Sequence, residues 1–306
     1  MSPPDPSRAP ARAVDPSRAN ARAVLLVLGS SATFTLAAAA VKGLEGAVPI
    51  AQLILFRNVF ALPLLFVMLM RAGGLALLVP RQPRWHVARI LCGMCGMVGA
   101  FAGYTWLPLA TATVLGFTMP LFLTALSVVL LGERVGWRRW SAVVVGFLGV
   151  LLVARPGGGE ALPLWPVLLV LLGSLGWALA MMSIRRMGQA GEHGVTIVLW
   201  FALGSTLLSG IATIPVWVDP TPRQWALLVA IGLVSAVAQL LMTEAYRRGD
   251  TTLLAPFEYS ALLWTMALGV AFWGEWPGVL DLLGFAVLVG AGLFIWWREL
   301  RLSQAR

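Results

Sequence analysis

Two charged residues interrupt long apolar stretches of this chain. Arg57 lies within the stretch 50–70, and Glu258 lies within the stretch 251–273. A charge inside an apolar helix is costly, so such residues are usually retained for binding or ion transfer. A guanidinium binds a carboxylate or phosphate, and a carboxylate binds an amine or carries a proton when burial favours its neutral form. Together, Arg57 and Glu258 predict a path for a zwitterion such as an amino acid.

Both charges also fit structural roles. Arg57 could extend to the membrane interface or bond backbone carbonyls, and Glu258 could bond a neighbouring helix. Aromatic side chains are further candidates for the walls of a substrate path, although most aromatic residues in apolar helices serve packing. The aromatic candidates are Phe257, Tyr259, Trp264, Trp177 and Tyr104. Pro120 and Pro256 are predicted to break or kink their helices, because proline lacks the N–H that an inner turn needs.

The sequence favours no enzymatic chemistry. His86 and His193 are the two histidines and form no H-E-x-x-H pattern, so we expect no metal site. Lys42 is the single lysine, and no G-x-x-x-x-G-K-[ST] phosphate loop exists. Cys92 and Cys95 lie in an apolar segment without a neighbouring acid or histidine, which favours packing over redox chemistry. We therefore expect neither an enzyme nor a bound cofactor.

Composition places the chain in a membrane. It is 59% hydrophobic and 11% charged, with a mean hydropathy of +0.86, whereas soluble domains contain about 25% charged residues. Since about 20 apolar residues cross a bilayer, the chain predicts ten membrane-spanning helices. Their approximate ranges are 22–41, 50–70, 86–107, 110–131, 138–154, 163–184, 194–217, 224–244, 251–273 and 278–297.

The positive charges predict the orientation. With ten spans, most of the 22 Lys and Arg residues fall on one side, which should be the cytoplasmic one. Lys42, Arg155 and Arg223 fall on the other side, and Arg89 counts with the cytoplasmic group. Residues 1–21, which contain a tandem ten-residue repeat rich in Pro, Ala and Arg, are expected to form a disordered basic arm. The net charge of +9 therefore predicts topology and no nucleic-acid partner, with both termini in the cytoplasm and the chain in the inner membrane.

The chain contains an internal repeat. Gly132-Glu133 recurs as Gly274-Glu275 after 142 residues, and the same offset superposes Tyr104 on Tyr246. Five predicted spans separate the copies, so the second copy would be inverted in the bilayer, as in many secondary transporters. The Gly-Glu pair itself is interpreted as a helix end, where glycine accepts a positive φ and glutamate favours the start of the next helix. The repeat units are predicted at 22–155 and 163–298, and residues 299–306 are predicted as a cytoplasmic tail.

These features resemble the drug/metabolite transporter superfamily, specifically its EamA-type members. The motifs that support the resemblance are Tyr104-x-x-Leu-Pro-Leu-Ala-x-Ala-Thr113, Leu131-Gly-Glu-Arg134, Gly146-x-x-Gly149 and Pro256-Phe-Glu-Tyr259, together with Pro120 and Gly274-Glu275. The resemblance implies an all-α integral membrane protein of two inverted five-helix repeats. It also implies a central cavity between the repeats that opens alternately to each side of the membrane.

The expected function is secondary transport of a small polar metabolite, an amino acid or a related zwitterionic or aromatic compound. Proton coupling is one version of this mechanism. The alternative is an uptake carrier for a vitamin or nucleoside-like compound such as riboflavin or S-adenosylmethionine, and a channel or a membrane scaffold is a further alternative. Expected partners are a small-molecule substrate and the lipid bilayer, and the protein is expected to be a monomer or a homodimer.

Overall fold

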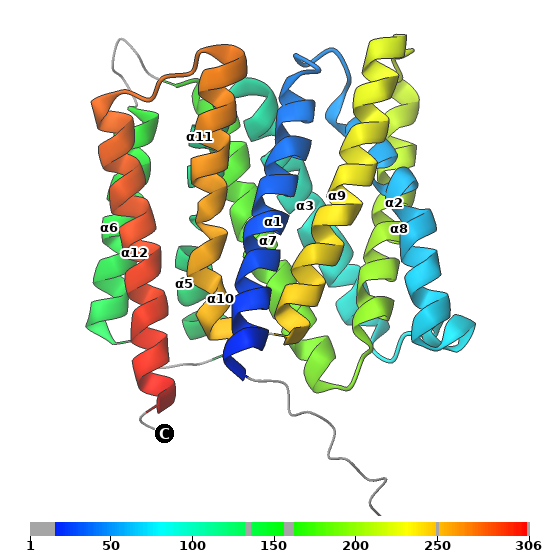
Figure 1. Cartoon of the computed structure of the whole chain (residues 1–306), viewed down its shortest axis with the longest axis horizontal. Coiled ribbons are helices and arrows are strands. Elements are labelled where there is room, and N and C mark those ends of the chain that lie inside the picture. The colour runs from blue at the N-terminus through cyan, green and yellow to red at the C-terminus, as the bar shows by residue number, and fades with distance from the viewer. Residues whose placement is uncertain (1–15, 132–135, 156–161, 249–250, 305–306) are drawn as a thin grey trace, which may run out of the picture.

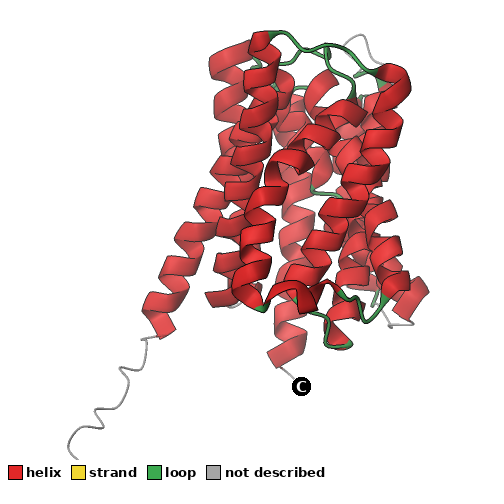
Figure 2. Cartoon of the chain, turned by 90° about the vertical axis from the view of Figure 1, so that its right-hand side faces the viewer, coloured by secondary structure: helices red, strands yellow, loops and turns green. Residues whose placement is uncertain are grey.

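The computed structural model describes residues 16–131, 136–155, 162–248 and 251–304, and all regular elements within these ranges are helices. Figure 1 shows them as a bundle of roughly parallel rods, and Figure 2 shows the same bundle from the side. The helices are α1 (Pro16–Lys42), α2 (Ile50–Ala72), η1 (Gly74–Leu78), α3 (Pro83–Trp106), α4 (Leu109–Gly116), α5 (Met119–Leu131), α6 (Trp137–Ala154), α7 (Leu164–Gln189), α8 (Gly194–Thr213), η2 (Ile214–Val216), α9 (Pro222–Arg248), α10 (Thr251–Glu258), α11 (Ser260–Trp273) and α12 (Val279–Gln304).

Length and apolar composition identify 8 segments of the described chain that could cross a membrane, along with the shorter apolar helix Trp140–Ala154. These segments include the predicted fourth span, as Leu109–Leu126. The predicted ninth span, 251–273, is not among them; it consists of two helices of 8 and 14 residues, α10 and α11. The described part of the chain is therefore an all-helical membrane bundle, in which the predicted fourth and ninth spans are each interrupted.

The first helix begins earlier than the predicted span. α1 starts at Pro16, so residues 16–21 of the predicted disordered arm are helical, while residues 1–15 lie outside the described part. Alanine and arginine favour a helix, and proline is accepted in its first turn. The apolar part of this helix that could cross the membrane is Arg22–Lys42. The described ends of the chain, the start of α1 and the end of α12, lie on the same face of the bundle, here called the terminal face (Figure 1).

The helix pairs follow the 142-residue offset. α3 packs along α7, and α9, which corresponds to α3, packs along α1, which corresponds to α7. α2 packs against its counterpart α8, and α6 packs against its counterpart α12. Figure 1 shows the α6–α12 and α2–α8 pairs on opposite flanks of the bundle, with α1, α3 and α7 between them. The two sequence halves are therefore interleaved and do not form separate globules.

Small residues bring the central helices close together. A Cβ placed on Gly99 of α3 would overlap the carbonyl of Leu169 and lie 2.7 Å from the Cα of Gly173 on α7. A Cβ on Gly149 of α6 would lie 3.1 Å from the carbonyl oxygen of Gly284 on α12. Because lipid offers helices no hydrophobic drive to associate, such close backbone packing is a main source of their attraction.

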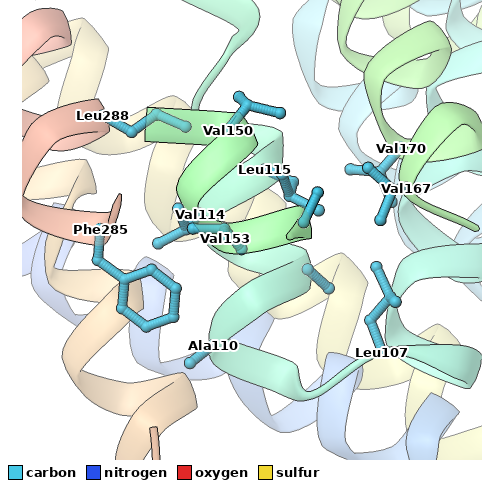
Figure 3. Packing of buried hydrophobic residues seen from close by; sticks show 12 residues of the cluster. Leu107, Ala110, Val114, Leu115, Val150, Val153, Val167, Val170, Phe285 and Leu288 are labelled. Atoms are coloured by element: carbon cyan, nitrogen blue, oxygen red, sulfur yellow. The ribbon is translucent and has the colours of Figure 1, made fainter. Parts of the chain in front are cut away.

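A buried apolar cluster fills the space around α4. Leu107, Ala110 and Leu115 contact side chains of α6, α7 and α12, among them Val150, Val167 and Phe285 (Figure 3). A second cluster joins α2, α3, α8 and α9 and includes Leu53, Met97, Phe201 and Ile231. Each cluster contains residues of both repeats, so the bundle is stabilised by contacts between the halves.

Candidate substrate-binding site

The two broken helices are interrupted at equivalent positions. α4 and α5 are separated by a turn at Phe117–Thr118, and α10 and α11 are separated at Tyr259. The offset of 142 residues superposes Phe117 on Tyr259. The two aromatic rings meet edge to face with their centroids 4.7 Å apart. The breaks of the two repeats therefore lie against each other inside the bundle.

Prolines flank the breaks without occupying them. Pro120 lies in the first turn of α5, where its missing N–H leaves no bond unmade. Pro256 lies inside α10, and the interruption follows three residues later at Tyr259, whose amide donates to the carbonyl of Pro256. In the first repeat, the hydroxyl of Ser174 on α7 donates weakly to the carbonyls of Leu115 and Gly116, at 3.4 Å each. At the first break, backbone carbonyls are thus within reach of a polar side chain.

The predicted residues Phe257, Glu258 and Tyr259 surround the second break. Glu258 is the last residue of α10 and is partly buried. Phe257 packs against a buried cluster that contains Ala23 and Val27 of α1. The Tyr259 hydroxyl points at Gly292 of α12, where a Cβ would overlap it. Two aromatic rings, those of Tyr259 and Phe117, therefore lie at the break that follows Glu258.

Arg57 lies in a different part of the bundle from Glu258. Arg57 belongs to α2, which packs on α8, α9 and α3, whereas Glu258 belongs to α10, which packs chiefly on α1, α12 and α11. The guanidinium of Arg57 approaches the Oδ1 of Asn58 at 3.3 Å and the sulfur of Met97 at 3.8 Å. The structure therefore places the two predicted charges on separate helix groups.

Arg89 is a second arginine inside the bundle, and its buried position is not predicted by the sequence pattern. The charge pattern groups Arg89 with the cytoplasmic positive residues, but its side chain is inside the bundle and the residue is 7% exposed. Its guanidinium lies over the ring of Phe201 on α8, at 3.9 Å from the centroid, and 5.4 Å from the ring of Trp177 on α7. Gly93, one turn along α3, leaves the room that this guanidinium occupies. A glycine one turn from an arginine near a helix start is the signal that could have indicated it.

The remaining predicted aromatic residues divide between these surroundings. Trp177 covers Gly96 of α3 and faces Arg89. Tyr104 packs against both large apolar clusters and lies on the same helix as Arg89. Trp264 on α11 is 43% exposed and contributes to neither group of contacts. The structure thus collects Arg57, Arg89, Trp177 and Tyr104 around α3, and Glu258, Phe257 and Tyr259 around the second break.

The second Gly-Glu pair makes contacts beyond a helix end. Gly274 ends α11 with φ +65°, as predicted from glycine's tolerance of positive φ. Glu275, however, does not begin α12; its Oε2 accepts from the amide of Leu109 at the start of α4, at 2.9 Å. Its Oε1 lies 2.5 Å from the Nζ of Lys42, which also donates to the carbonyl of Leu107 at 2.8 Å. Glu275 therefore pairs with the other repeat, and the first Gly-Glu pair lies outside the described residues.

His86 lies in a polar cluster near the terminal face. The described residues hold no group of three or more His, Cys, Asp or Glu side chains that could bind a metal ion. His86 is buried beside Glu192, with 3.4 Å between Nε2 and Oε2, and Glu192 accepts from the amides of Arg81 and Gln82. This cluster links the start of α3 to the α7–α8 loop on the terminal face. A hollow of about 350 Å³ lies elsewhere on that face, lined by Arg22, Leu25, Leu26 and Glu244.

Comparison with known proteins identifies the family. The sequence model of the EamA-like transporter family matches residues 21–155 and again residues 164–297. The chain belongs to the EamA-like transporter family. A solved crystal structure superposes on it with a TM-score of 0.63, covering 94% of this chain and 99% of that one at 22% identity, which shows a shared fold.

Several relatives of this EamA protein are transporters of different compounds. The pseudopaline exporter CntI of Pseudomonas aeruginosa (strain UCBPP-PA14) is 32% identical over 88% of this chain and 93% of the exporter. A riboflavin transporter of Rhizobium johnstonii is 32% identical over 80% of this chain and 79% of the transporter. An S-adenosylmethionine uptake transporter of Rickettsia bellii is 28% identical over 71% and 74% of the two chains. The chain is thus a member of a family of membrane transporters.

Proposed function

We propose that this protein is a secondary transporter that moves a small polar metabolite across the cytoplasmic membrane by alternating access. The carrier would consist of two inverted five-helix repeats that cross the membrane ten times, with α10 and α11 together forming the ninth crossing. The two matched family segments and the equivalent helix breaks at Phe117 and Tyr259 support this arrangement.

The observation that best supports alternating access is the packing of the face opposite the termini, here called the opposite face. On the face opposite the termini, α4 packs on α11 and α1 packs on α3, and the Lys42–Glu275 ion pair joins the same elements. In an inverted repeat, the corresponding contacts on the terminal face would join α5 to α10 and α7 to α9. Alternating access would exchange the contacts of the opposite face for this second set. This arrangement fits a carrier that is closed at the opposite face.

The positive charges support the proposed orientation. They gather on the terminal face, so we place this face, and both chain ends, in the cytoplasm. The state described here would then be closed to the outside. Opening the opposite face while closing the terminal face would complete one transport step.

The relatives include an exporter and an uptake transporter, so the proposal has an export version and an uptake version. The similarity to an exporter fits a polar metabolite that leaves the cell. The similarity to a riboflavin transporter and to an S-adenosylmethionine uptake transporter fits the second candidate equally well, an uptake carrier for a vitamin or nucleoside-like compound. In either version, Glu258 at the second helix break is the proposed site at which a proton or an amine binds.

Reconstitution tests the proposal. The purified protein in liposomes should move one of a panel of radiolabelled amino acids, vitamins and nucleosides with a rate that saturates with concentration. Glu258→Gln and Arg57→Ala should reduce that flux, and Arg155→Gln, which alters an ion pair of the α6–α12 flank, is the control. Unsaturable flux would indicate a channel, and the absence of flux across the panel would contradict the proposal.

A further inference from the structure

Arg89 is a buried cation whose hydrogen-bonding groups are not satisfied by the protein. It is 7% exposed, and its Nε and one of its Nη atoms have no hydrogen-bond partner within the described chain. The rings of Phe201 and Trp177 attract the positive charge but accept no conventional hydrogen bond. A guanidinium has five N–H donors in a planar fork, and leaving such donors buried without acceptors is costly. A bound acceptor would remove that cost.

Arg57 brings a second guanidinium to the same face of α3. Its Nη1 lies 3.8 Å from the sulfur of Met97, and the guanidinium of Arg89 occupies the room beside Gly93. Gly93 and Met97 are one helical turn apart, which is about 6 Å along the helix at 1.5 Å per residue. Both guanidinium groups therefore lie along the same face of α3. No ion pair joins either of them to a carboxylate in the ranges that the structure describes.

The inverted repeat shows that packing does not require these arginines. The 142-residue offset superposes Arg57 on Leu199 and Arg89 on Ile231. Leu199 is 4% exposed and Ile231 is 0% exposed, so the corresponding part of the bundle is filled by apolar side chains. The second repeat therefore accommodates an apolar residue at both equivalent positions, and only the first repeat contains two charges there. The difference points to a ligand.

We infer that Arg57 and Arg89 together bind the acidic group of the transported compound, a carboxylate or a phosphate. The inference rests on the proposed transport function and narrows its substrate class to compounds that carry an acidic group. Two guanidinium forks can surround one oxyanion, and the charge-assisted hydrogen bonds would satisfy the donors of Arg89. Trp177 and Phe201 flank Arg89, so an apolar or planar part of the compound would lie against these rings.

Binding of defined anions to the purified protein tests this site. We would measure its thermal unfolding at constant ionic strength with succinate, with phenyl phosphate and with the uncharged succinamide. Since a ligand of the folded state raises its stability, succinate or phenyl phosphate should raise the unfolding midpoint by a few degrees, on the order of the shift expected at saturating ligand. Succinamide should not. Comparison of the two anions distinguishes a carboxylate site from a phosphate site.

Substitutions that copy the equivalent residues of the second repeat separate an effect on binding from an effect on folding. Arg57→Leu and Arg89→Ile install the residues that the corresponding positions already contain, and both should abolish the anion-dependent shift while the protein still folds. Arg89→Lys should retain a weaker shift, because lysine keeps the charge but lacks the fork. Arg71→Leu removes an exposed arginine of the same helix α2 and should keep the full shift.

Two outcomes would overturn the inference: anions that fail to raise the midpoint of the wild-type protein, or a shift that persists in Arg89→Ile. Transport distinguishes this failure from failure of the proposed function. Saturable flux of neutral or cationic compounds without anion binding would retain the transporter and reject the anion site. An anion-dependent shift without flux of any compound would retain the site and reject the transporter.

Discussion

The ion pair between Lys42 and Glu275 should hold the opposite face of the bundle closed. The Nζ and Oε1 atoms are 2.5 Å apart, and the side chains are 11% and 19% exposed. Lys42→Met removes this pair and the bond to the carbonyl of Leu107, while Glu275 keeps only the amide of Leu109.

Breaking a buried ion pair costs about 3–5 kcal/mol, and an exposed pair contributes about 0–1 kcal/mol. For this mostly buried pair we expect about 2 kcal/mol. If the pair exists only in the closed state, the ratio of open to closed molecules should rise about 30-fold, because each 1.4 kcal/mol changes an equilibrium about tenfold.

Cysteine labelling in proteoliposomes measures this ratio. Ala110, on α4 just beyond the ion pair, is 7% exposed and would become the reporter Ala110→Cys in a Cys92→Ser, Cys95→Ser background. A maleimide that cannot cross lipid should label this cysteine about tenfold or more faster in Lys42→Met, given the 30-fold change in the equilibrium. Arg155→Gln alters another ion pair, with Asp281, and should leave the labelling rate unchanged.

An unchanged labelling rate in Lys42→Met would refute the reasoning, provided that the reporter reacts fully in unfolded protein. A faster rate in both Lys42→Met and Arg155→Gln would also contradict it, since the effect would then be a general loosening of the bundle. Glu275→Gln should accelerate labelling like Lys42→Met, because it removes the same pair. The double variant should label no faster than the faster of the two single variants, since both changes act on one interaction.

Three further predictions concern packing, the helix breaks and coupling. Gly99→Leu should lower the unfolding temperature sharply, since its side chain would overlap the backbone of α7, at a cost of about 1–3 kcal/mol or more; Gly290→Ala, with nothing within 4 Å of its Cβ, should be neutral in the same scan. Tyr259→Ala should reduce flux about tenfold because it removes the ring against Phe117, whereas Tyr259→Phe should keep most of the flux if the ring contact matters more than the hydroxyl; equal losses in both variants would contradict this. If Glu258 carries a proton, a pH gradient should change the wild-type rate and not the rate of Glu258→Gln, and a pH response that survives in this variant would exclude it as the coupling residue.

The placement of Arg89 shows that the sequence pattern predicts the position of a residue along a helix but not the direction of its side chain. An arginine close to the start of a membrane helix usually extends to the interface, and the sequence alone indicates that position. Which way it points depends on the rotation of α3 about its axis, and that rotation is set by the close contact of Gly99 with Gly173 on α7. The partner glycine belongs to the other repeat, so no local pattern reveals the contact.

The equivalent helix breaks likewise combine a feature that the sequence predicts with one that the packing decides. Pro120 and Pro256 indicate that the fourth and ninth spans are irregular, since proline cannot complete a helical hydrogen-bond pattern. They do not superpose under the repeat offset, and the breaks lie instead at Phe117–Thr118 and Tyr259. The meeting of these two rings, 4.7 Å apart, is a product of the packing of the two halves against each other.

The sequence by itself determined the membrane environment, most of the helices, the repeat and the family motifs. These properties depend on composition, on apolar run length and on backbone preferences, all of which are local. Only the tertiary structure decided that Arg57 and Arg89 lie along one face of α3, apart from Glu258, and that Glu275 pairs with Lys42. Such contacts join residues far apart in the chain, and they depend on how helices of the two repeats approach and rotate against one another.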